Sequence, residues 1–315
     1  MEFGYFTLSD NHYPNNPRSA NQFVLEIREQ AILADRIGLH SAWIGEHHFD
    51  SLGVNSRPDL LLANIASVTK NIRLAPAVTV LPLHHPVHVA EAWATLDVLS
   101  GGRVDMGLGA GWLEEDYTKT GVATWDEPEV RVSRLFESIT VLRALFSGEP
   151  VTHAGRFYDV TDFVSHPKPV QDPVPLMIGG RGKRMLSFAA RHAQIVSVLA
   201  GTSAGGSSVA AFEEQLQWIE DAGGRARTDL MVGIRVPFGA AALEGESTRD
   251  VAERFGAMGR MSADDAIASP FVLVGDHAAI VDQVVEVQER YGVSYITVSE
   301  GFGWQIGPVL EQLSD

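Results

Sequence analysis

The alternation of short apolar runs with longer amphipathic stretches constrains the fold of this chain more than any other feature. Runs rich in β-branched and aliphatic residues are separated by stretches with helical spacing, which is typical of repeated βα units around a parallel sheet. We predict strands at about 2–8, 41–45, 72–80, 103–108, 175–179, 194–199, 229–236 and 294–299. Eight such units favour a closed barrel, so the predicted fold class is α/β, a (β/α)8 TIM barrel.

The stretches between the strands carry apolar faces. Phe23, Ile27 and Ala31 recur at helical spacing in the first of them, and Leu135 and Ile139 do so in a later one. The chain therefore contains the outer helices that a barrel of this kind requires.

Two regions do not fit a bare count of βα units. They cover about 112–174, which includes the hairpin-like run VTHAGRFYDV, and about 238–270, which is polar and rich in glycine. We interpret them as insertions after strand 4 and strand 7 of a single domain that covers 1–315, and as substrate lids, because barrel active sites lie in the loops at the carboxyl ends of the strands. A two-domain alternative would need a glycine-rich dinucleotide fingerprint after the first strand, where the sequence is LSDNHYPNNP.

Charge and composition exclude several function classes. The formal net charge is −16 and no window is rich in Lys and Arg, so we expect no nucleic-acid partner. The absence of cysteine excludes disulfides, thiolate metal sites and a catalytic thiol. The amino terminus resembles no signal peptide and no apolar run reaches about 18 residues, so we predict a cytoplasmic protein without a membrane partner.

Glu46, His47 and His48 directly follow the second predicted strand. Alternation places His47 on one side of the chain, and Glu46 and His48 on the other. At least one imidazole should face the mouth of the barrel, where it could act on a proton during catalysis. The alternative is a histidine with a structural role only.

Three more histidines, His84, His85 and His88, lie around the start of the next helix. Such a group is compatible with a metal site, because imidazole is a common zinc ligand. A metal-dependent barrel hydrolase would also need ligands from other strand ends, and the first strand lacks a His-x-His motif. We therefore predict no metal site.

The turn after the fifth predicted strand has the composition of an anion site. Gly179, Gly180, Arg181, Gly182 and Lys183 lead directly into a helix. Glycines let backbone N–H groups approach a phosphate, the helix N-terminus is electropositive, and two side chains add full charges. The alternative is an ordinary glycine-rich turn with solvated basic residues. The turn does not match the Walker motif.

Three segments together resemble the luciferase-like monooxygenase family: WIGEHHF, APAVTVLPLHHP and TLDVLSGGRVDMGLGAGW. The resemblance is strong over about 1–115, continues through GGRGK, and is weaker through FVLVGDHAAIVDQVV. It implies a barrel that binds reduced FMN or the deazaflavin F420. It further implies oxidation of a small organic molecule with O2, a separate flavin reductase as partner, and a homodimer.

The resemblance also assigns roles to single residues. It makes His47 the catalytic histidine, with Glu46 beside it, and places a non-prolyl cis peptide beneath the flavin at Ala77–Val78. It matches Gly179, Gly180 and Lys183 to the phosphate-binding turn, where Arg181 and Gly182 complete the predicted cofactor site.

Two positions depart from the light-emitting luciferase subunit. Gly109 stands in place of a reactive cysteine near the flavin, and Ala110 stands in place of an arginine that helps to hold the phosphate. These departures argue against transferring light emission or a long-chain aldehyde substrate to this chain.

Several hypotheses about function stay open. Members that use F420 often carry Asp-His where this chain has Glu46, His47 and His48, so the resemblance favours FMN, and an F420-dependent hydride-transfer enzyme is the alternative. A flavin-binding protein without catalysis and a metal-dependent barrel hydrolase are less favoured. Trp112, Phe302 and Trp304 lie on loops that could keep water from the site.

Overall fold

The strands form where the β-branched runs predict them. The computed structural model describes residues 1–12, 15–48, 53–199, 209–224, 230–236, 238–243, 245–257, 261–299 and 307–314. Each of the predicted runs contains a strand; these strands are β1 (Glu2–Thr7), β2 (Ser41–Ile44), β3 (Arg73–Pro76), β4 (Thr79–Val80), β5 (Met106–Gly109), β8 (Leu176–Gly180), β9 (Ile195–Val198), β10 (Met231–Val236) and β13 (Tyr295–Ser299). The third run contains both β3 and β4, and the peptide bond between them, Ala77–Val78, is cis as predicted.

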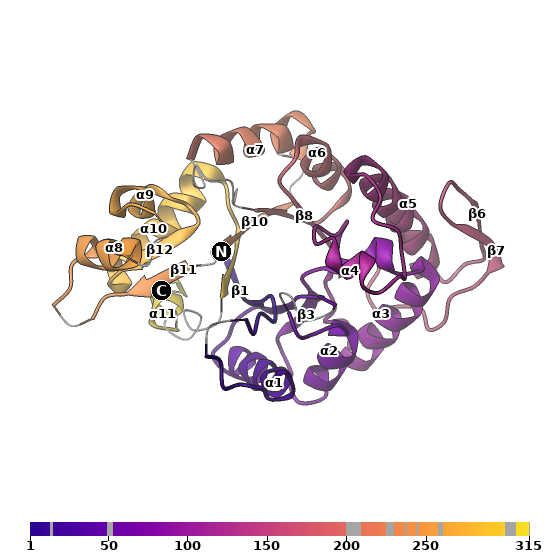
Figure 1. The fold of residues 1–315 in the computed structure, drawn as a ribbon, viewed down its shortest axis with the longest axis horizontal. Helices are drawn as coiled ribbons and strands as arrows, with labels where there is room; N and C mark the ends of the chain where they lie inside the picture. The colour runs from indigo at the N-terminus through magenta and orange to yellow at the C-terminus, as the bar shows by residue number, and fades with distance from the viewer. Residues whose placement is uncertain are drawn as a thin grey trace. The chain divides into compact units, whose positions relative to one another are not determined.

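The chain divides into two compact units, whose helices and strands are labelled in Figure 1. The N-terminal unit is Thr7–Met177, and the C-terminal unit combines Met1–Phe6 with Ile178–Asp315. Each unit contains parallel strands with helices against them, which is the arrangement that βα units produce.

In the N-terminal unit, β2 pairs with β3 and β4 pairs with β5, both in parallel. Its helices are α1 (Ala20–Arg36), α2 (Pro58–Ala66), η1 (Leu81–Leu83), α3 (Pro86–Ser100), α4 (Glu115–Thr118) and α5 (Pro128–Phe146). Successive helices pack against each other, α1 on α2, α2 on α3 and α3 on α5. The predicted apolar faces are buried, as shown by Phe23 and Ile27 in α1 and by Leu135 and Ile139 in α5.

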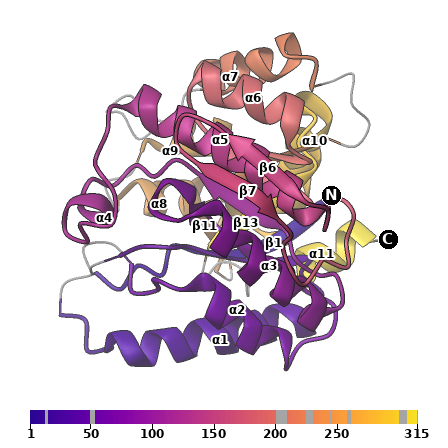
Figure 2. The same cartoon turned by 90° about the vertical axis from the view of Figure 1, so that its right-hand side faces the viewer.

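The first inserted region contains the predicted hairpin. It carries α4, α5 and the antiparallel strands β6 (Val151–Ala154) and β7 (Asp159–Phe163). Figure 2 shows the hairpin beside α5. Glu137 of α5 fixes it there, because its carboxylate accepts hydrogen bonds from the backbone N–H groups of Arg156, Phe157 and Tyr158.

In the C-terminal unit, the strand order is β1-β13-β10-β9-β8. Its helices are α6 (Lys183–His192), α7 (Val209–Asp221), α8 (Thr248–Ala257), α9 (Ala263–Ala268), α10 (His277–Tyr291) and α11 (Gly307–Ser314). The second inserted region is more regular than its polar composition suggests. It contains α8, α9 and β11 (Phe238–Ala241), which pairs in parallel with β12 (Val272–Gly275), a strand that the sequence analysis did not predict.

That additional pair of strands has its own small core. Val251 and Ala252 of α8, Ala266 of α9, and Val272 and Val274 of β12 are buried together. The described parts of the chain include no helix that is both long enough and apolar enough to cross a bilayer.

Candidate active site

The segment after β2 is held by backbone hydrogen bonds on both sides. The N–H of Gly45 donates to the carbonyl of Thr7, and the N–H of His47 donates to the carbonyl of Asn55. The side chain of Asn55 donates in turn to the carbonyl of Gly45. A Cβ atom at Gly45 would lie 3.1 Å from the Cα of Leu8, so only glycine lets the two segments approach this closely. The backbone therefore fixes where the next three side chains point.

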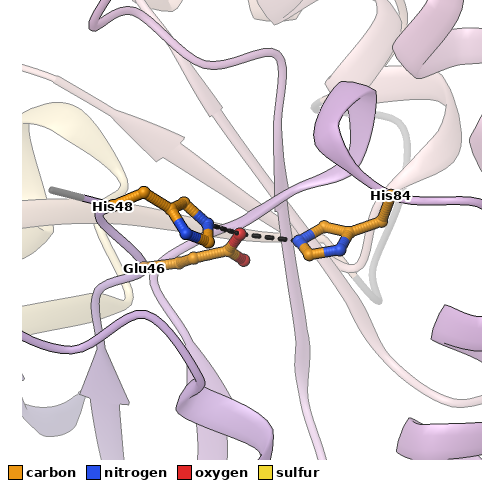
Figure 3. A group of neighbouring side chains, drawn as sticks. All are labelled: Glu46, His48 and His84. Atoms are coloured by element: carbon orange, nitrogen blue, oxygen red, sulfur yellow. Dashed lines mark hydrogen bonds and ion pairs between the residues drawn. The ribbon is translucent and has the colours of Figure 1, made fainter. Parts of the chain in front are cut away.

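Glu46 points away from His47, as the alternation predicted, and lies between two imidazoles. Its Oε1 is 2.9 Å from Nε2 of His48 and 2.6 Å from Nε2 of His84, while its Oε2 accepts a hydrogen bond from the N–H of Val80. Figure 3 shows the carboxylate between the two rings. Burial alone would raise the pKa of Glu46, but the hydrogen bonds and charges of the two histidines outweigh it and lower the pKa to about 2. Glu46 is therefore a buried carboxylate anion.

The same pairing raises the pKa of His84, whereas it lowers the pKa of Glu46. Burial would lower the pKa of His84, but the hydrogen bond to Glu46 and the negative charge of that carboxylate outweigh burial and raise it. The carboxylate therefore favours a positively charged partner beside it.

His47 contacts a different carboxylate, that of Asp116 in α4. Its Nδ1 lies 3.2 Å from Oδ2 of Asp116, and Oδ1 of the same carboxylate accepts a hydrogen bond from the N–H of His48 at 2.7 Å. His47 and Asp116 are both buried. The ring of Trp112 meets the imidazole edge-on, with 6.1 Å between the ring centroids, although 65% of Trp112 is exposed. The site thus has a buried His–Asp pair with an aromatic side chain over it.

Asp116 is the site residue that the sequence analysis missed. It is the last of three consecutive acids, Glu114, Glu115 and Asp116, in the first inserted region. Nothing in their spacing distinguishes them. In the structure Asp116 is buried, whereas Glu114 is exposed and Glu115 is partly exposed. Only the fold therefore distinguishes the third acid from the other two.

The residues that were predicted beneath the flavin lie together in the N-terminal unit. The N–H of Ala77 donates to the carbonyl of Ile44, and both Ala77 and Val78 remain partly exposed. A Cβ atom at Gly109 would lie only 2.4 Å from Cγ2 of Val78, so a side chain at this position would force Val78 to move. Thr79 is buried, and its Oγ1 has no hydrogen-bond partner among the described residues.

The predicted anion turn lies in the C-terminal unit, where β8 ends and α6 begins. Gly182 occupies the N-cap position of α6, and in this described segment no side chain caps the first turn. A Cβ atom at Gly182 would meet nothing within 4 Å. Arg181 and Lys183 are exposed on either side of it, and the carbonyl of Arg181 accepts a hydrogen bond from Gln215. The turn has the open backbone and positive charge that an anion requires.

The three histidines near the start of α3 do not converge. The Nδ1 of His85 accepts a hydrogen bond from the N–H of Val87, and His88 lies beside Glu91 on the exposed helix surface. Only His84 turns toward Glu46. Of the predicted aromatic shield, Trp112 contacts His47, whereas Phe302 and Trp304 lie outside the described residues.

Comparison with a solved structure identifies the fold class. The oxygenating constituent of 3,6-diketocamphane monooxygenase from Pseudomonas putida, a type II Baeyer–Villiger monooxygenase in complex with FMN, superposes with a TM-score of 0.70. The match covers 99% of this chain and 95% of that chain at 19% identity. It confirms the predicted fold class, α/β with a (β/α)8 barrel.

A family model described as luciferase-like monooxygenase matches residues 1–294. The chain therefore belongs to the luciferase-like monooxygenase family, and the predicted resemblance is confirmed.

Curated relatives of this chain use two kinds of cofactor. The oxygenase component of flavin-dependent trigonelline monooxygenase from Acinetobacter baylyi is 30% identical over 63% of this chain and 54% of its own length. An F420-dependent glucose-6-phosphate dehydrogenase from Amycolatopsis mediterranei is 32% identical over 55% of this chain and 53% of its own length. The chain thus spans about half the length of the curated relatives that it matches.

Proposed function

We propose that this chain is the oxygenase of a flavin-dependent monooxygenase that oxidises a small organic substrate with O2 and reduced FMN. The observation that carries the proposal is the buried pair of His47 and Asp116 in a member of this family. The similarity to an enzyme named as a flavin-dependent oxygenase component, and to a structure in complex with FMN, supports it. A separate reductase would then supply the reduced flavin.

His47 is the proposed catalytic residue. Because its Nδ1 faces the carboxylate of Asp116, its Nε2 is the nitrogen that remains for exchanging a proton with the substrate. A positioned imidazole in this role contributes a factor of roughly 10² to 10⁴ to the rate. The edge of Trp112 beside the imidazole would limit the access of water. Glu46, predicted together with His47, would support the site from the other side by holding His48 and His84.

The ring of the cofactor would be held by Ala77, Val78, Gly109 and Ala110. When bound, reduced FMN would supply the electrons that activate O2. The residues fit a flat ring, because Ala77 and Val78 are partly exposed and Gly109 adds no side chain beside them. The buried hydroxyl of Thr79, which lacks a partner among the described residues, would find one in a polar atom of the ring.

The phosphate of the cofactor would be held by Gly179, Gly180, Arg181, Gly182 and Lys183. The N-terminus of α6 supports this assignment, because a helix leaves its first N–H groups without partners inside the helix and no described side chain caps them here. Lys183 adds a full positive charge at the same helix end.

Replacing His47 tests the proposal directly. In His47→Ala, O2-dependent product formation with reduced FMN should fall by roughly 10² to 10⁴, because the proton acceptor is lost. The affinity for reduced FMN should stay within a few-fold, because the cofactor contacts are intact. The matched control is His88→Ala, which removes an exposed imidazole and should turn over normally. Equal turnover by the two variants would remove His47 from its role.

An F420-dependent hydride transfer is the second candidate, since an F420-dependent dehydrogenase is among the curated relatives. Such an enzyme would turn over without O2 and would change the absorbance of the deazaflavin. Anaerobic turnover with F420, and none with reduced FMN and O2, would replace the first proposal by the second.

We also propose that residues 1–315 form one domain.

We further propose that two copies of the chain associate through outer helices. Leu25 of α1 and Leu60 of α2 support this association, because 62% and 64% of these large apolar side chains are exposed. Sedimentation analysis should show a dimer that Leu25→Glu with Leu60→Glu converts to a monomer. A wild-type monomer would contradict the proposal.

A further inference from the structure

Three side chains on the far side of the segment that carries His47 converge on one point. A carboxylate oxygen of Glu46 and one ring nitrogen each of His48 and His84 all lie within 4.8 Å of one another. They come from two separate segments, the end of β2 and the turn after η1, which fold together here (Figure 3). We propose that Glu46, His48 and His84 form a binding site for a divalent transition-metal cation, of which Zn²⁺ fits the ligand set best.

The chemistry of the three groups favours this ion. Two imidazole nitrogens and one carboxylate oxygen are a ligand set that zinc adopts in sites with an open fourth position for water. Both imidazoles present Nε2 to the same carboxylate oxygen, Oε1 of Glu46. The other oxygen, Oε2, is held by the N–H of Val80, so the carboxylate is already oriented by the kind of outer hydrogen bond that surrounds metal ligands.

The spacing of the ligand atoms is close to that of a metal centre. Tetrahedral ligands at about 2.0–2.2 Å from zinc lie about 3.3 Å from one another. The two Nε2 atoms lie 2.9 Å and 2.6 Å from Oε1 of Glu46. The two Nε2 atoms lie within 4.8 Å of each other. Roughly 0.4 Å and 0.7 Å of opening at Glu46, together with rotation of the two rings about the ion, would therefore admit it, and small side-chain rotations supply such shifts.

Burial and access also suit a cation. Only 2% of the side chain of Glu46 is exposed, and a buried carboxylate is stable only beside a compensating positive charge. The imidazoles of His48 and His84 are 19% and 29% exposed, so an ion and its water ligand can reach the group from their side.

The two segments that carry the ligands would be joined by the ion. Glu46 and His48 flank His47 in the chain, so an occupied site would stiffen the backbone that positions this imidazole. The proposal differs from the sequence-based prediction of no metal site, which considered His84 together with His85 and His88. The metal proposal does not depend on the proposed flavin chemistry, because binding of the ion is measured without any cofactor.

Calorimetric titration with zinc chloride tests the proposal on the full chain after treatment with a chelator and buffer exchange. The wild type should take up one ion per chain. In His84→Gln and, separately, in His48→Gln, the affinity should fall by about 10- to 100-fold or more, because each change removes one ligand. The matched control His88→Gln, in an exposed histidine nearby, should bind as the wild type does.

Titration with Co²⁺ adds a spectroscopic readout, because its visible absorption reports imidazole and carboxylate ligands. The wild type should develop this absorption and His84→Gln should lose it, while circular dichroism shows that the variant is folded. Failure of the wild type to take up either ion would overturn the proposal. So would equal affinities for zinc in the wild type and in both ligand variants.

Discussion

The carboxylate of Asp116 determines which nitrogen of His47 is available for chemistry. It faces Nδ1 of the imidazole and also accepts the N–H of His48, so it fixes both the ring and the backbone behind it. Groups that orient a catalytic or metal-binding histidine in this way typically change its function 10- to 100-fold when they are removed. We therefore propose Asp116 as a positioning residue for His47, the proposed catalytic histidine.

Asp116→Asn tests that assignment. We expect kcat/KM to fall by about 10- to 100-fold, because the amide no longer provides an anion that holds the ring in one tautomer. The pH dependence of kcat/KM should shift as well, which a merely structural role would not cause. The control is Glu115→Gln in the same helix, whose carboxylate pairs with Lys119 at the surface. A normal rate with an unchanged pH profile would contradict the positioning role.

Substitution of Lys183 tests whether this residue holds the phosphate of the cofactor. If its charge holds the cofactor phosphate, Lys183→Ala should weaken binding of reduced FMN by about tenfold, the loss of one charge-assisted contact. Binding of reduced riboflavin, which lacks the phosphate, should change little. The ratio of the two affinities, measured by anaerobic fluorescence titration, isolates the phosphate contact. The exposed Lys119 serves as a control, and an equal effect on both flavins would exclude the predicted phosphate turn.

At the scale of elements, Asp35 ties the end of α1 to the start of β3. Its carboxylate accepts hydrogen bonds from the N–H groups of Lys70, Asn71 and Ile72 at 3.1, 2.9 and 2.7 Å. Burial alone would raise the pKa of Asp35, but these three backbone bonds and the charge of Arg103 outweigh it and lower the pKa.

Asp35→Asn should therefore destabilise the protein in a pH-dependent way. A carboxylate with a lowered folded-state pKa stabilises the fold above its unfolded value, about 3.9, and this contribution is lost as the pH falls through the folded value. We expect the variant to lose about 1–2 kcal/mol of unfolding free energy at neutral pH. Urea denaturation across the range from neutral to acidic pH should show the difference from wild type shrinking as the pH drops below 4. A constant difference would indicate that ionisation of Asp35 plays no part.

The strands could be predicted from sequence because short runs rich in β-branched residues alternate with longer stretches of helical spacing, which is typical of βα units. The cis peptide within the third run and the hairpin were also predicted, the first through the family resemblance and the second from the hairpin-like run VTHAGRFYDV. The pair β11 and β12 was missed, because each is only four residues long and they lie at the two ends of the polar, glycine-rich region, where so short a run does not differ from a buried loop segment.

The site could be predicted only where it follows a strand end directly. Position and alternation located His47 and separated it from Glu46 and His48. The contacts with Asp116 and His84 depend on how α4 and η1 pack, which no local pattern reveals. A sequence shows which residues end a strand, but the partners of those residues come from elements that are distant along the chain.

For the whole molecule, membership of the family supports the barrel fold and a flavin or deazaflavin cofactor. It does not determine whether that cofactor is FMN or F420. The relatives include both flavin-dependent and F420-dependent enzymes, and this chain spans about half of their length. The preference for FMN rests on the family resemblance at Glu46, His47 and His48, and it remains a proposal.

Anaerobic titration of the chain with reduced FMN and, in parallel, with reduced F420 distinguishes the two candidate cofactors. We expect saturable binding of one reduced FMN per chain, tighter than binding of reduced F420. Uptake of neither cofactor, or preference for reduced F420, would contradict this expectation.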